Sequence, residues 1–362
     1  MREQSRAVTA LKGTVLVLVS LLVMALVLEG VLRLLDRVRA PAVPVPQEAA
    51  APEEDGDEEV GLTVPDPLLA WSFRPSAEGT FKRGAHPTQV VTNELGLRSP
   101  SVAALGDSGV RILVLGDSYG FGWGVDESDC FPRLLESKLR ERHPGAGVAV
   151  INASAPGYGL YQQTAMFEKV RETVEVDVVV STYSLANDPL DDLRILRFAP
   201  DRLLKYSPQL VEKNGVVRWF IRHSALVRLV DHRTSGLQFK MVNTSSEATE
   251  ASELCMRALF STLGDHGIRV VQVQIPQRWE VKDRAGADLL KASTKPVREM
   301  RERVASEFGV LSVDAARALL DLEESTGDAY LSNDAHWTPA GHDAVAEVIL
   351  DALPPDWFIA ER

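Results

Sequence analysis

The chain has 362 residues, enough for one large domain or two modest ones, and 45% of them are hydrophobic, which is ample for a buried core. The formal net charge is −12, so we expect no nucleic-acid partner, because such a partner needs a basic surface. The two cysteines, Cys130 and Cys255, match no metal-ligand spacing, which favours two unpaired thiols, with one disulfide as the alternative. The seven histidines are scattered and indicate no metal site.

The N-terminal segment is apolar enough to cross a membrane. Residues 13–28 carry no charge, and the apolar character continues to residue 35, a length that can just span a bilayer. We therefore predict a cytoplasmic tip and a transmembrane signal-anchor within residues 1–39, with the remainder outside the cytoplasm, in the periplasm if the cell is Gram-negative. The alternative is a cleaved signal peptide with an A-x-A-like site at residues 40–42. Four charged residues separate that site from the apolar run, which favours the uncleaved anchor.

Two segments separate this anchor from the main domain. Residues 40–60 are acidic and rich in Pro and Ala, a composition typical of an extended linker that holds a domain away from the membrane. Residues 61–110 contain short apolar runs broken by Pro and Gly, which predicts a small β-rich lead-in. No function can be assigned to this lead-in from its sequence.

From residue 111 onward, apolar strands alternate with helices, which is typical of a parallel α/β sheet. We predict one domain over residues 111–362, folded as a three-layer α/β/α sandwich. An insertion at about 191–246, with a candidate hairpin at 210–217 and a candidate helix at 224–230, either shapes access to a site or decorates the surface. The predicted strands are 112–115, 148–152, 176–183, 268–275 and 310–313, and the predicted helices are 131–142, 160–173, 252–265, 295–308 and 339–353.

A serine follows the first predicted strand, in the stretch RILVLGDSYGFGWGV at residues 111–125. Ligands of open parallel sheets bind beyond the carboxyl ends of the strands, so Ser118 is a candidate nucleophile. An upstream copy, Gly106-Asp107-Ser108, has no strand before it and is interpreted as a surface turn. The literal G-x-S-x-G at 116–120 raises the alternative of an α/β-hydrolase elbow, but that fold needs several strands before its serine.

Three further stretches are expected at the same edge of the sheet as Ser118. They are residues 152–159, NASAPGYG, then Asn187-Asp188, and finally residues 333–337, NDAHW. Serine is a poor nucleophile unless a base takes its proton, and histidine has a suitable pKa. His336 is therefore the candidate base, and Asp334 is the candidate carboxylate that orients its ring.

An acyl-transfer site also needs donors for the oxyanion of the tetrahedral intermediate. The candidate donors are the backbone N–H groups of Ser118 and Gly157 and the side-chain amide of Asn187.

Several neighbouring residues are expected to have other roles. Asp117 braces the turn before Ser118, Asp188 is structural, and Asp328 is a distant substitute for Asp334. His342, inside the last helix, is predicted to lie at the surface. Four aromatic residues either line an acyl or sugar site or belong to the core: Tyr119, Phe121, Trp123 and Tyr158.

The blocks around Ser118, Gly157, Asn187 and His336 resemble, in identity and order, those of the SGNH, or GDSL, hydrolase superfamily. The resemblance covers roughly residues 111–353. It implies an SGNH-like sandwich and an acyl-enzyme mechanism.

Two positions depart from the pattern of that superfamily. Leu185 stands where many members carry Gly, and Asn333 stands where many carry the acid. The segment DAHWTPAG, residues 334–341, instead resembles the D-x-H-W pattern of the alginate O-acetyltransferase branch, whose exported, membrane-tied members modify polysaccharides. This second resemblance favours Asp334 as the acid.

Together these features predict a membrane-anchored, exported serine esterase that acts on O-acyl esters, such as acetyl groups, of envelope glycans. One alternative is an O-acetyltransferase of a cell-surface polysaccharide, and another is a non-catalytic binding or assembly component with the same fold. The expected partners are the ester or glycan substrate, the membrane and proteins of an envelope-polysaccharide pathway. No metal or cofactor is expected, because the triad supplies both the nucleophile and the proton transfer.

Overall fold

The computed structural model describes residues 61–81, 86–105, 109–185, 187–197, 245–278, 281, 284–332 and 334–358, together with Ser20 and Met24. The chain divides into two compact units, and every strand and helix described below belongs to the unit formed by Asp57–Tyr206 and Lys240–Arg362. Within the described residues, no helix is long and apolar enough to cross a membrane. Several predicted features lie outside the described residues: the signal-anchor apart from Ser20 and Met24, the linker, the copy at 106–108, Asn333, and the candidate hairpin and helix at 210–217 and 224–230.

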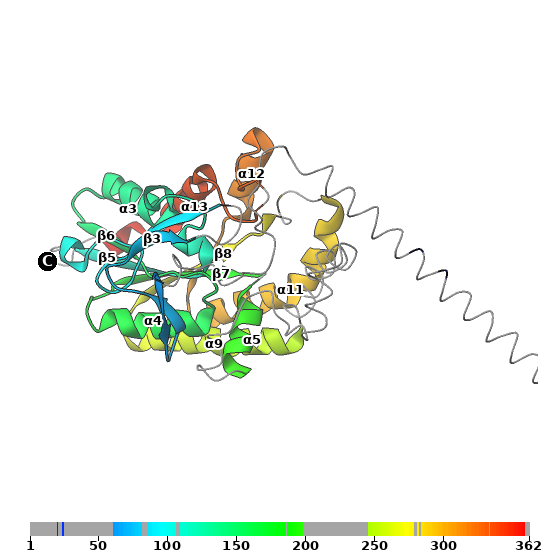
Figure 1. The fold of residues 1–362 in the computed structure, drawn as a ribbon, viewed down its shortest axis with the longest axis horizontal. Coiled ribbons are helices and arrows are strands. Elements are labelled where there is room, and N and C mark those ends of the chain that lie inside the picture. The colour runs from blue at the N-terminus through cyan, green and yellow to red at the C-terminus, as the bar shows by residue number, and fades with distance from the viewer. Residues whose placement is uncertain are drawn as a thin grey trace, which may run out of the picture. The chain divides into compact units, whose positions relative to one another are not determined.

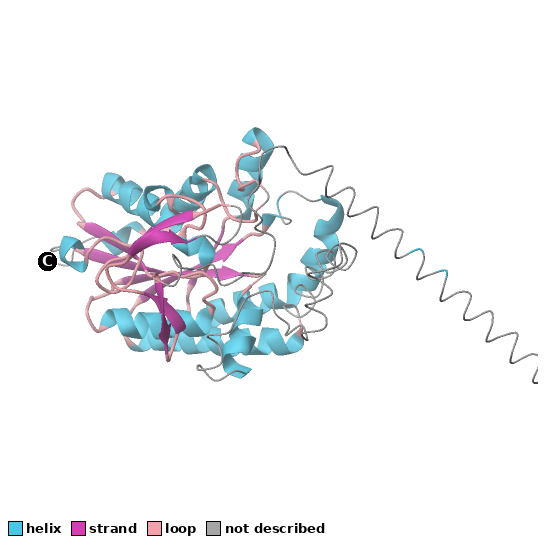
Figure 2. Ribbon diagram, in the orientation of Figure 1, coloured by secondary structure: helices cyan, strands magenta, loops and turns pink. Residues whose placement is uncertain are grey.

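A parallel five-stranded sheet forms the centre of this unit (Figure 2). The strands are β5 (Val110–Leu115), β6 (Val148–Asn152), β7 (Val178–Ser184), β8 (Arg269–Ile275) and β9 (Leu311–Asp314). They lie in the order β6-β5-β7-β8-β9, so the direction of winding reverses between β5 and β7. Open α/β sheets bind ligands beyond the strand carboxyl ends at such a reversal.

Helices cover both faces of the sheet, and β5 and β6 are accordingly nearly continuous apolar runs. The other three strands mix apolar and polar residues. Alternate residues of β5 point to opposite layers, so Leu113 lies in the core on one side and Ile112 in the core on the other. Ile112 pairs with Val150 on β6 and with Val178 on β7. All five predicted strands are confirmed, each end within two residues of its predicted position.

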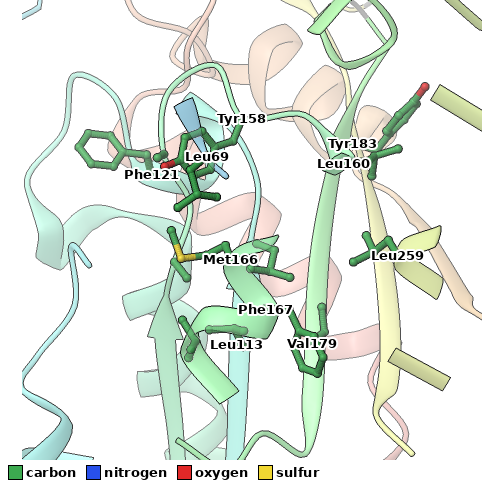
Figure 3. Packing of buried hydrophobic residues seen from close by; sticks show 14 of the residues in the cluster. Leu69, Leu113, Phe121, Tyr158, Leu160, Met166, Phe167, Val179, Tyr183 and Leu259 are labelled. Atoms are coloured by element: carbon green, nitrogen blue, oxygen red, sulfur yellow. The ribbon is translucent and has the colours of Figure 1, made fainter. Parts of the chain in front are cut away.

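Two layers of helices complete a three-layer sandwich (Figure 1). One layer holds α4 (Leu160–Arg171), α5 (Asp188–Arg197), α9 (Ser246–Asp265) and α11 (Arg284–Glu307). The other holds α3 (Phe131–Arg142), α12 (Ala316–Thr326) and α13 (Pro339–Ala352). Figure 3 shows the first layer meeting the sheet, where Phe167 of α4 and Leu259 of α9 share a core with Leu113 and Val179. The predicted α/β/α architecture is confirmed.

The last helix begins as its sequence predicts. The hydroxyl of Thr338, the residue before the helix, accepts a hydrogen bond from the Gly341 N–H at 3.1 Å, and Pro339 occupies the first helical position. These two residues fix where the chain turns from the loop that carries His336 into α13.

Among the described helices of ten or more residues, α5 and α12 are absent from the prediction. Helix α5 occupies the first part of the predicted insertion and packs on α9. Its Asp188 and Asp192 are buried, although charged residues ordinarily indicate an exposed segment. Burial raises the pKa of Asp192 to about 8, while its carboxylate oxygens accept hydrogen bonds from Ser252 Oγ and the Tyr161 N–H.

The lead-in consists of two antiparallel pairs of short strands. The first pair is β1 (Thr63–Asp66) with β2 (Ala70–Phe73), and the second is β3 (Glu78–Phe81) with β4 (Thr88–Val91). The Phe73 ring stacks on Phe121 at 5.2 Å, and the Tyr158 hydroxyl donates to the Trp71 carbonyl at 2.6 Å. The lead-in therefore shares a core with the sheet domain. Three 3₁₀ turns are described as well: Val102–Leu105, Glu127–Asp129 and Pro355–Phe358.

Both cysteines are buried and unpaired. Burial raises the pKa of the Cys130 thiol to about 11 and raises that of Cys255 as well. Both are therefore protonated thiols at neutral pH, and neither is an activated nucleophile.

His342 is buried, not at the surface as its sequence position predicts. It lies one turn into α13, on the side that faces α3, and its Nδ1 accepts the Phe131 N–H at 3.2 Å. That N–H is at the first position of α3 and has no partner within the helix. Burial lowers the pKa of His342 from its usual 6.5 to about 3, so the ring is neutral in the folded protein.

Replacing His342 is expected to weaken the acid sensitivity of the fold. Between pH 6.5 and about 3 the unfolded chain binds a proton that native His342 does not, so this residue lowers the free energy of unfolding as pH falls through that window. His342→Asn keeps an acceptor near Nδ1 and removes the titration. In urea unfolding, the loss of stability from pH 6.5 to pH 5 should be about 2 kcal/mol smaller in the variant. An equal loss in both proteins would contradict a buried neutral histidine.

Candidate active site

Ser118 lies where the chain leaves β5 and starts the short helix α2 (Ser118–Phe121). Asp117 caps this helix, its Oδ1 accepting the Tyr119 N–H at 3.0 Å. Gly116 has no room for a side chain, because an added Cβ would collide with the Thr182 hydroxyl of β7. The turn is therefore tight, and it holds Ser118 at the carboxyl edge of the sheet, next to the winding reversal.

The structure brings Ser118, His336 and Asp334 together. His336 Nε2 lies 2.7 Å from Ser118 Oγ, and His336 Nδ1 lies 2.6 Å from Asp334 Oδ1. The same Asp334 oxygen accepts the backbone N–H of His336 at 3.0 Å. With the ring proton on Nδ1, the imidazole donates to the carboxylate and accepts from the serine hydroxyl. The predicted serine, histidine and acid thus form one hydrogen-bonded series.

Asp334 is an ionised carboxylate in this arrangement. Partial burial alone would raise its pKa, but the hydrogen bond and the charge of the His336 ring and the local backbone N–H groups outweigh that effect and lower the pKa to about 2. Only 14% of the Asp334 side chain is exposed. Water therefore competes little for the carboxylate that holds the ring.

The loop that carries Asp334 and His336 is fixed by hydrogen bonds at both ends. Its ends meet where the Leu331 N–H donates to the His336 carbonyl at 2.9 Å. Arg278, just beyond β8, donates from Nη1 to the carbonyls of Leu331 and Asp334 at 3.1 and 2.9 Å. Tyr119 donates its hydroxyl to the Ala335 carbonyl at 3.0 Å. The acid and base are thus held from β8 and from the serine helix.

Two aromatic rings flank His336. The Tyr119 centroid lies 4.7 Å from the imidazole centroid, and Trp123 stacks on the imidazole at 5.4 Å with planes 21° apart. The other two aromatic residues of the predicted cluster, Phe121 and Tyr158, are buried in the core with Phe73 and Trp71. All four aromatic residues are buried in the core, as the second interpretation predicts, and Tyr119 and Trp123 contact the His336 ring as well.

The predicted oxyanion donors lie on loops at the same sheet edge. Asn187 follows β7, and its Nδ2 donates one hydrogen to Asp117 Oδ2 at 3.0 Å, which leaves the second hydrogen of the amide for another acceptor. Gly157 follows β6 with φ +76°, and a Cβ there would meet no described atom within 4 Å. The side of Gly157 on which a side chain would lie is therefore open.

The two neighbouring carboxyl groups act within the protein framework. Asp117 is buried and binds Tyr119 and Asn187, and burial raises its pKa. Asp188 is also buried, accepts the Ser184 N–H at 3.0 Å, and has its pKa raised by burial and by the nearby Asp117. Neither is hydrogen-bonded to His336 among the described contacts. Asp328, the predicted substitute acid, is exposed, and its carbonyl accepts the Thr338 hydroxyl.

Sequence reasoning missed a set of residues that hold the site from a distance. They include Arg278 and Gln277, whose amide bridges the Ser184 and Tyr119 hydroxyls, and three residues of the lead-in. His86 Nε2 lies 2.8 Å from the Ser332 carbonyl, Thr88 accepts the Gly124 N–H at 2.8 Å, and Arg98 donates to the Gly122 carbonyl at 2.7 Å. None of these belongs to a recognisable motif, so the sequence alone carries no signal for them.

No group of three or more His, Cys, Asp or Glu side chains in the described part of the chain is arranged to hold a metal ion.

A family model matches residues 114–344, about two-thirds of the chain, and that stretch contains Ser118, Gly157, Asn187, Asp334 and His336. The chain belongs to the GDSL-like lipase/acylhydrolase family. It is accordingly an ester hydrolase, and the non-catalytic alternative is set aside. The match is to the family as a whole and does not single out the alginate O-acetyltransferase branch. The lead-in lies before the matched residues.

Several solved structures are similar to this GDSL-family chain. An α/β hydrolase enzyme from the metagenome of Lake Arreo, Spain, is 17% identical, with 68% of this chain and 96% of that chain covered and a TM-score of 0.44. An acetyl xylan esterase is 14% identical over 68% of this chain and 100% of its own, with a TM-score of 0.44. An acetyl xylan esterase from Geobacillus stearothermophilus is 16% identical, with 68% of this chain and 94% of that chain covered and a TM-score of 0.42. No curated protein matches the sequence.

Proposed function

We propose that this GDSL-family ester hydrolase acts through a Ser118-His336-Asp334 triad and a covalent acyl-enzyme. The observation that carries the proposal is the hydrogen-bonded series from Asp334 through His336 to Ser118, with contacts of 2.6 and 2.7 Å. Both contacts have the lengths expected for a base that is oriented by a carboxylate and already bonded to its nucleophile.

Acylation begins when Ser118 Oγ attacks the carbonyl carbon of the ester. His336 Nε2 takes the hydroxyl proton as the bond forms, and Asp334 stabilises the resulting imidazolium. His336 then gives the proton to the departing alcohol oxygen, which leaves the acyl group on Ser118. In the second half, His336 takes a proton from water, the hydroxide attacks the acyl carbon, and the proton returns to Ser118 Oγ as the acid departs.

The backbone N–H groups of Ser118 and Gly157 and the Asn187 amide are proposed to bind the oxyanion of each tetrahedral intermediate. Asn187→Ala is expected to lower kcat for 4-nitrophenyl acetate by about 10²–10³-fold, because one preorganised donor is lost in the transition state. KM should change much less, and the thermal midpoint controls for folding. A kcat within about twofold of wild type would remove Asn187 from the oxyanion site.

The proposed substrate is an acetyl ester of an envelope glycan. Support comes from the DAHWTPAG segment at 334–341, which resembles a branch that modifies polysaccharides. The test is hydrolysis of 4-nitrophenyl acetate, butyrate and palmitate, together with acetate release from acetylated polysaccharides. We expect kcat/KM to fall from acetate to palmitate, and acetate release from at least one glycan that depends on Ser118. A preference for palmitate would instead indicate a lipase.

Acetyl transfer to a glycan is the second candidate, and the same D-x-H-W segment favours it. Both reactions share the acyl-enzyme and differ in whether water or a sugar hydroxyl takes the acyl group. The two are separated by supplying 4-nitrophenyl acetate with and without an unacetylated polysaccharide and measuring acetylated glycan against free acetate. Hydrolysis predicts free acetate in both cases.

The enzyme is further proposed to be held at the membrane by its N-terminal segment and to act outside the cytoplasm. The support is the uncharged run at 13–28, followed by the acidic segment at 40–60. The full chain should stay in the membrane fraction after alkaline extraction, whereas a chain that starts at residue 61 should be released. Release of the full chain would point to the cleaved signal peptide.

A further inference from the structure

Arg98 is a buried cation whose hydrogen-bond acceptors, among the described residues, are all backbone carbonyl groups. It is 1% exposed, and no carboxylate of the described residues lies within ion-pair distance of it. Nη1 donates to the carbonyls of Phe121 and Gly122 at 2.9 and 2.7 Å, and Nη2 donates to those of Gln89 and Val125 at 2.9 and 2.8 Å. A guanidinium is suited to this role, because its planar fork points several donors in fixed directions.

Three of these four carbonyls belong to the last residue of the serine helix and to the turn that follows it. The last carbonyls of a helix have no partner within it, and the Gly122 residue after α2 adopts φ +83°. The Arg98 guanidinium also lies 4.9 Å over the Phe121 ring. Arg98 therefore fixes the path of residues 121–125 and ties it to β4 of the lead-in through Gln89.

The turn that Arg98 holds carries the ring that covers His336. Trp123 lies in its middle and stacks on the imidazole at 5.4 Å, and the Trp123 N–H donates to the Ser118 carbonyl at 3.0 Å. The indole blocks one face of the imidazole, and Tyr119 flanks the ring as well. If the turn shifted, His336 would gain freedom to rotate out of line between Asp334 and Ser118.

We propose that Arg98 is a positioning residue for catalysis, which holds the turn at 121–125 so that Trp123 keeps the His336 ring aligned with Ser118. Arg98 lies outside the residues matched by the family model, so the lead-in supplies a part of the catalytic arrangement that the matched region lacks. This inference rests on the proposed triad.

The test is a double-mutant cycle between Arg98 and Trp123 in the full chain, with 4-nitrophenyl acetate as substrate. Arg98→Lys keeps the positive charge but replaces the planar guanidinium, with its two donating Nη atoms, by a single ammonium group. Trp123→Leu removes the ring that stacks on His336. Each single variant is expected to lower kcat about 10- to 100-fold with KM nearly unchanged, since misalignment of reacting groups affects the chemical step. In the Trp123→Leu background, Arg98→Lys should lower kcat by less than about threefold further, because Arg98 affects His336 only through Trp123.

Arg269→Lys is the matched control. Arg269 also donates to a carbonyl, that of Trp357 at 3.0 Å, and lies over an aromatic ring, but at the opposite end of β8 from the site. Its variant should leave kcat unchanged. Full additivity of Arg98→Lys and Trp123→Leu, or a kcat for Trp123→Leu within about twofold of wild type, would overturn the proposal. The second outcome needs no folded Arg98 variant.

Ser118→Ala in the same assay distinguishes failure of the positioning role of Arg98 from failure of the proposed triad. If Ser118→Ala is inactive while Arg98→Lys has wild-type kcat, the positioning role fails and the triad stands. If Ser118→Ala keeps activity, the triad itself is wrong, and with it the role of Arg98.

Discussion

Ser118→Ala is expected to lower esterase kcat by about 10⁴-fold or more, the largest effect of any single substitution in this chain. The Ser118 hydroxyl lies 2.7 Å from His336 Nε2, and its removal leaves the base with no proton to take. The backbone N–H of residue 118 remains available to an oxyanion in the variant. Its residual rate should therefore exceed the rate in water alone.

The upstream serine provides the control for this loss. Ser108 belongs to an upstream copy of the Gly-Asp-Ser triplet, and no predicted strand precedes that copy. Ser108→Ala should therefore keep full activity. Steady-state hydrolysis of 4-nitrophenyl acetate by both variants is sufficient to compare them. Loss of activity in Ser108→Ala with retention in Ser118→Ala would exchange the two roles and contradict the proposed mechanism.

Asp334→Asn is expected to lower kcat by about 10³–10⁴-fold with little change in KM. The carboxylate accepts from His336 Nδ1 at 2.6 Å and so places the ring lone pair on Nε2, toward the serine. An amide can present its NH₂ group to Nδ1, which favours the opposite tautomer and leaves Nε2 protonated. The variant should fold, because the amide still fits the site, and Asp328→Asn serves as the exposed control.

The stability of the protein should respond to Asp334 only in acid. Its pKa is about 2 in the folded chain against an ordinary 3.8, so the unfolded chain binds more protons between these values. The stabilisation that this carboxylate supplies is therefore fully present above pH 3.8 and is lost as pH falls through 2. From pH 5 down to about pH 2, urea unfolding should therefore show a larger loss of stability in the wild type than in Asp334→Asn. An equal loss in both proteins over that range would contradict the low pKa of Asp334.

The sheet was predictable because apolar strands alternate with helices along the chain. β5 and β6 carry almost no polar residue. The other three strands contain polar residues as well, and they were recognised from their apolar residues and their place between helices. Helix α5 was hidden because Asp188 and Asp192 are charged in the sequence, yet the fold buries them against backbone and hydroxyl donors. No local pattern distinguishes such carboxyl groups from exposed ones.

The central residues of the site were predictable because each follows a strand or precedes a helix within a short motif. Ser118, Asn187 and His336 all lie in such positions. The residues that hold the His336 loop and the turn at 121–125 in place were not predictable. Arg98 and Arg278 come from other parts of the chain and bind backbone carbonyl groups, which every residue has, so no motif marks them. His342 was misplaced for a related reason, since a histidine in a helix gives no sign of which neighbour will cover it.

The most direct test of the proposed mechanism is labelling of the full chain with a fluorophosphonate, followed by peptide mass spectrometry. The mechanism predicts one adduct on the peptide that contains Ser118, absent in Ser118→Ala, strongly reduced in His336→Ala and retained in Ser108→Ala. A folded wild-type protein that hydrolyses 4-nitrophenyl acetate but forms no adduct on Ser118 would contradict the acyl-enzyme mechanism.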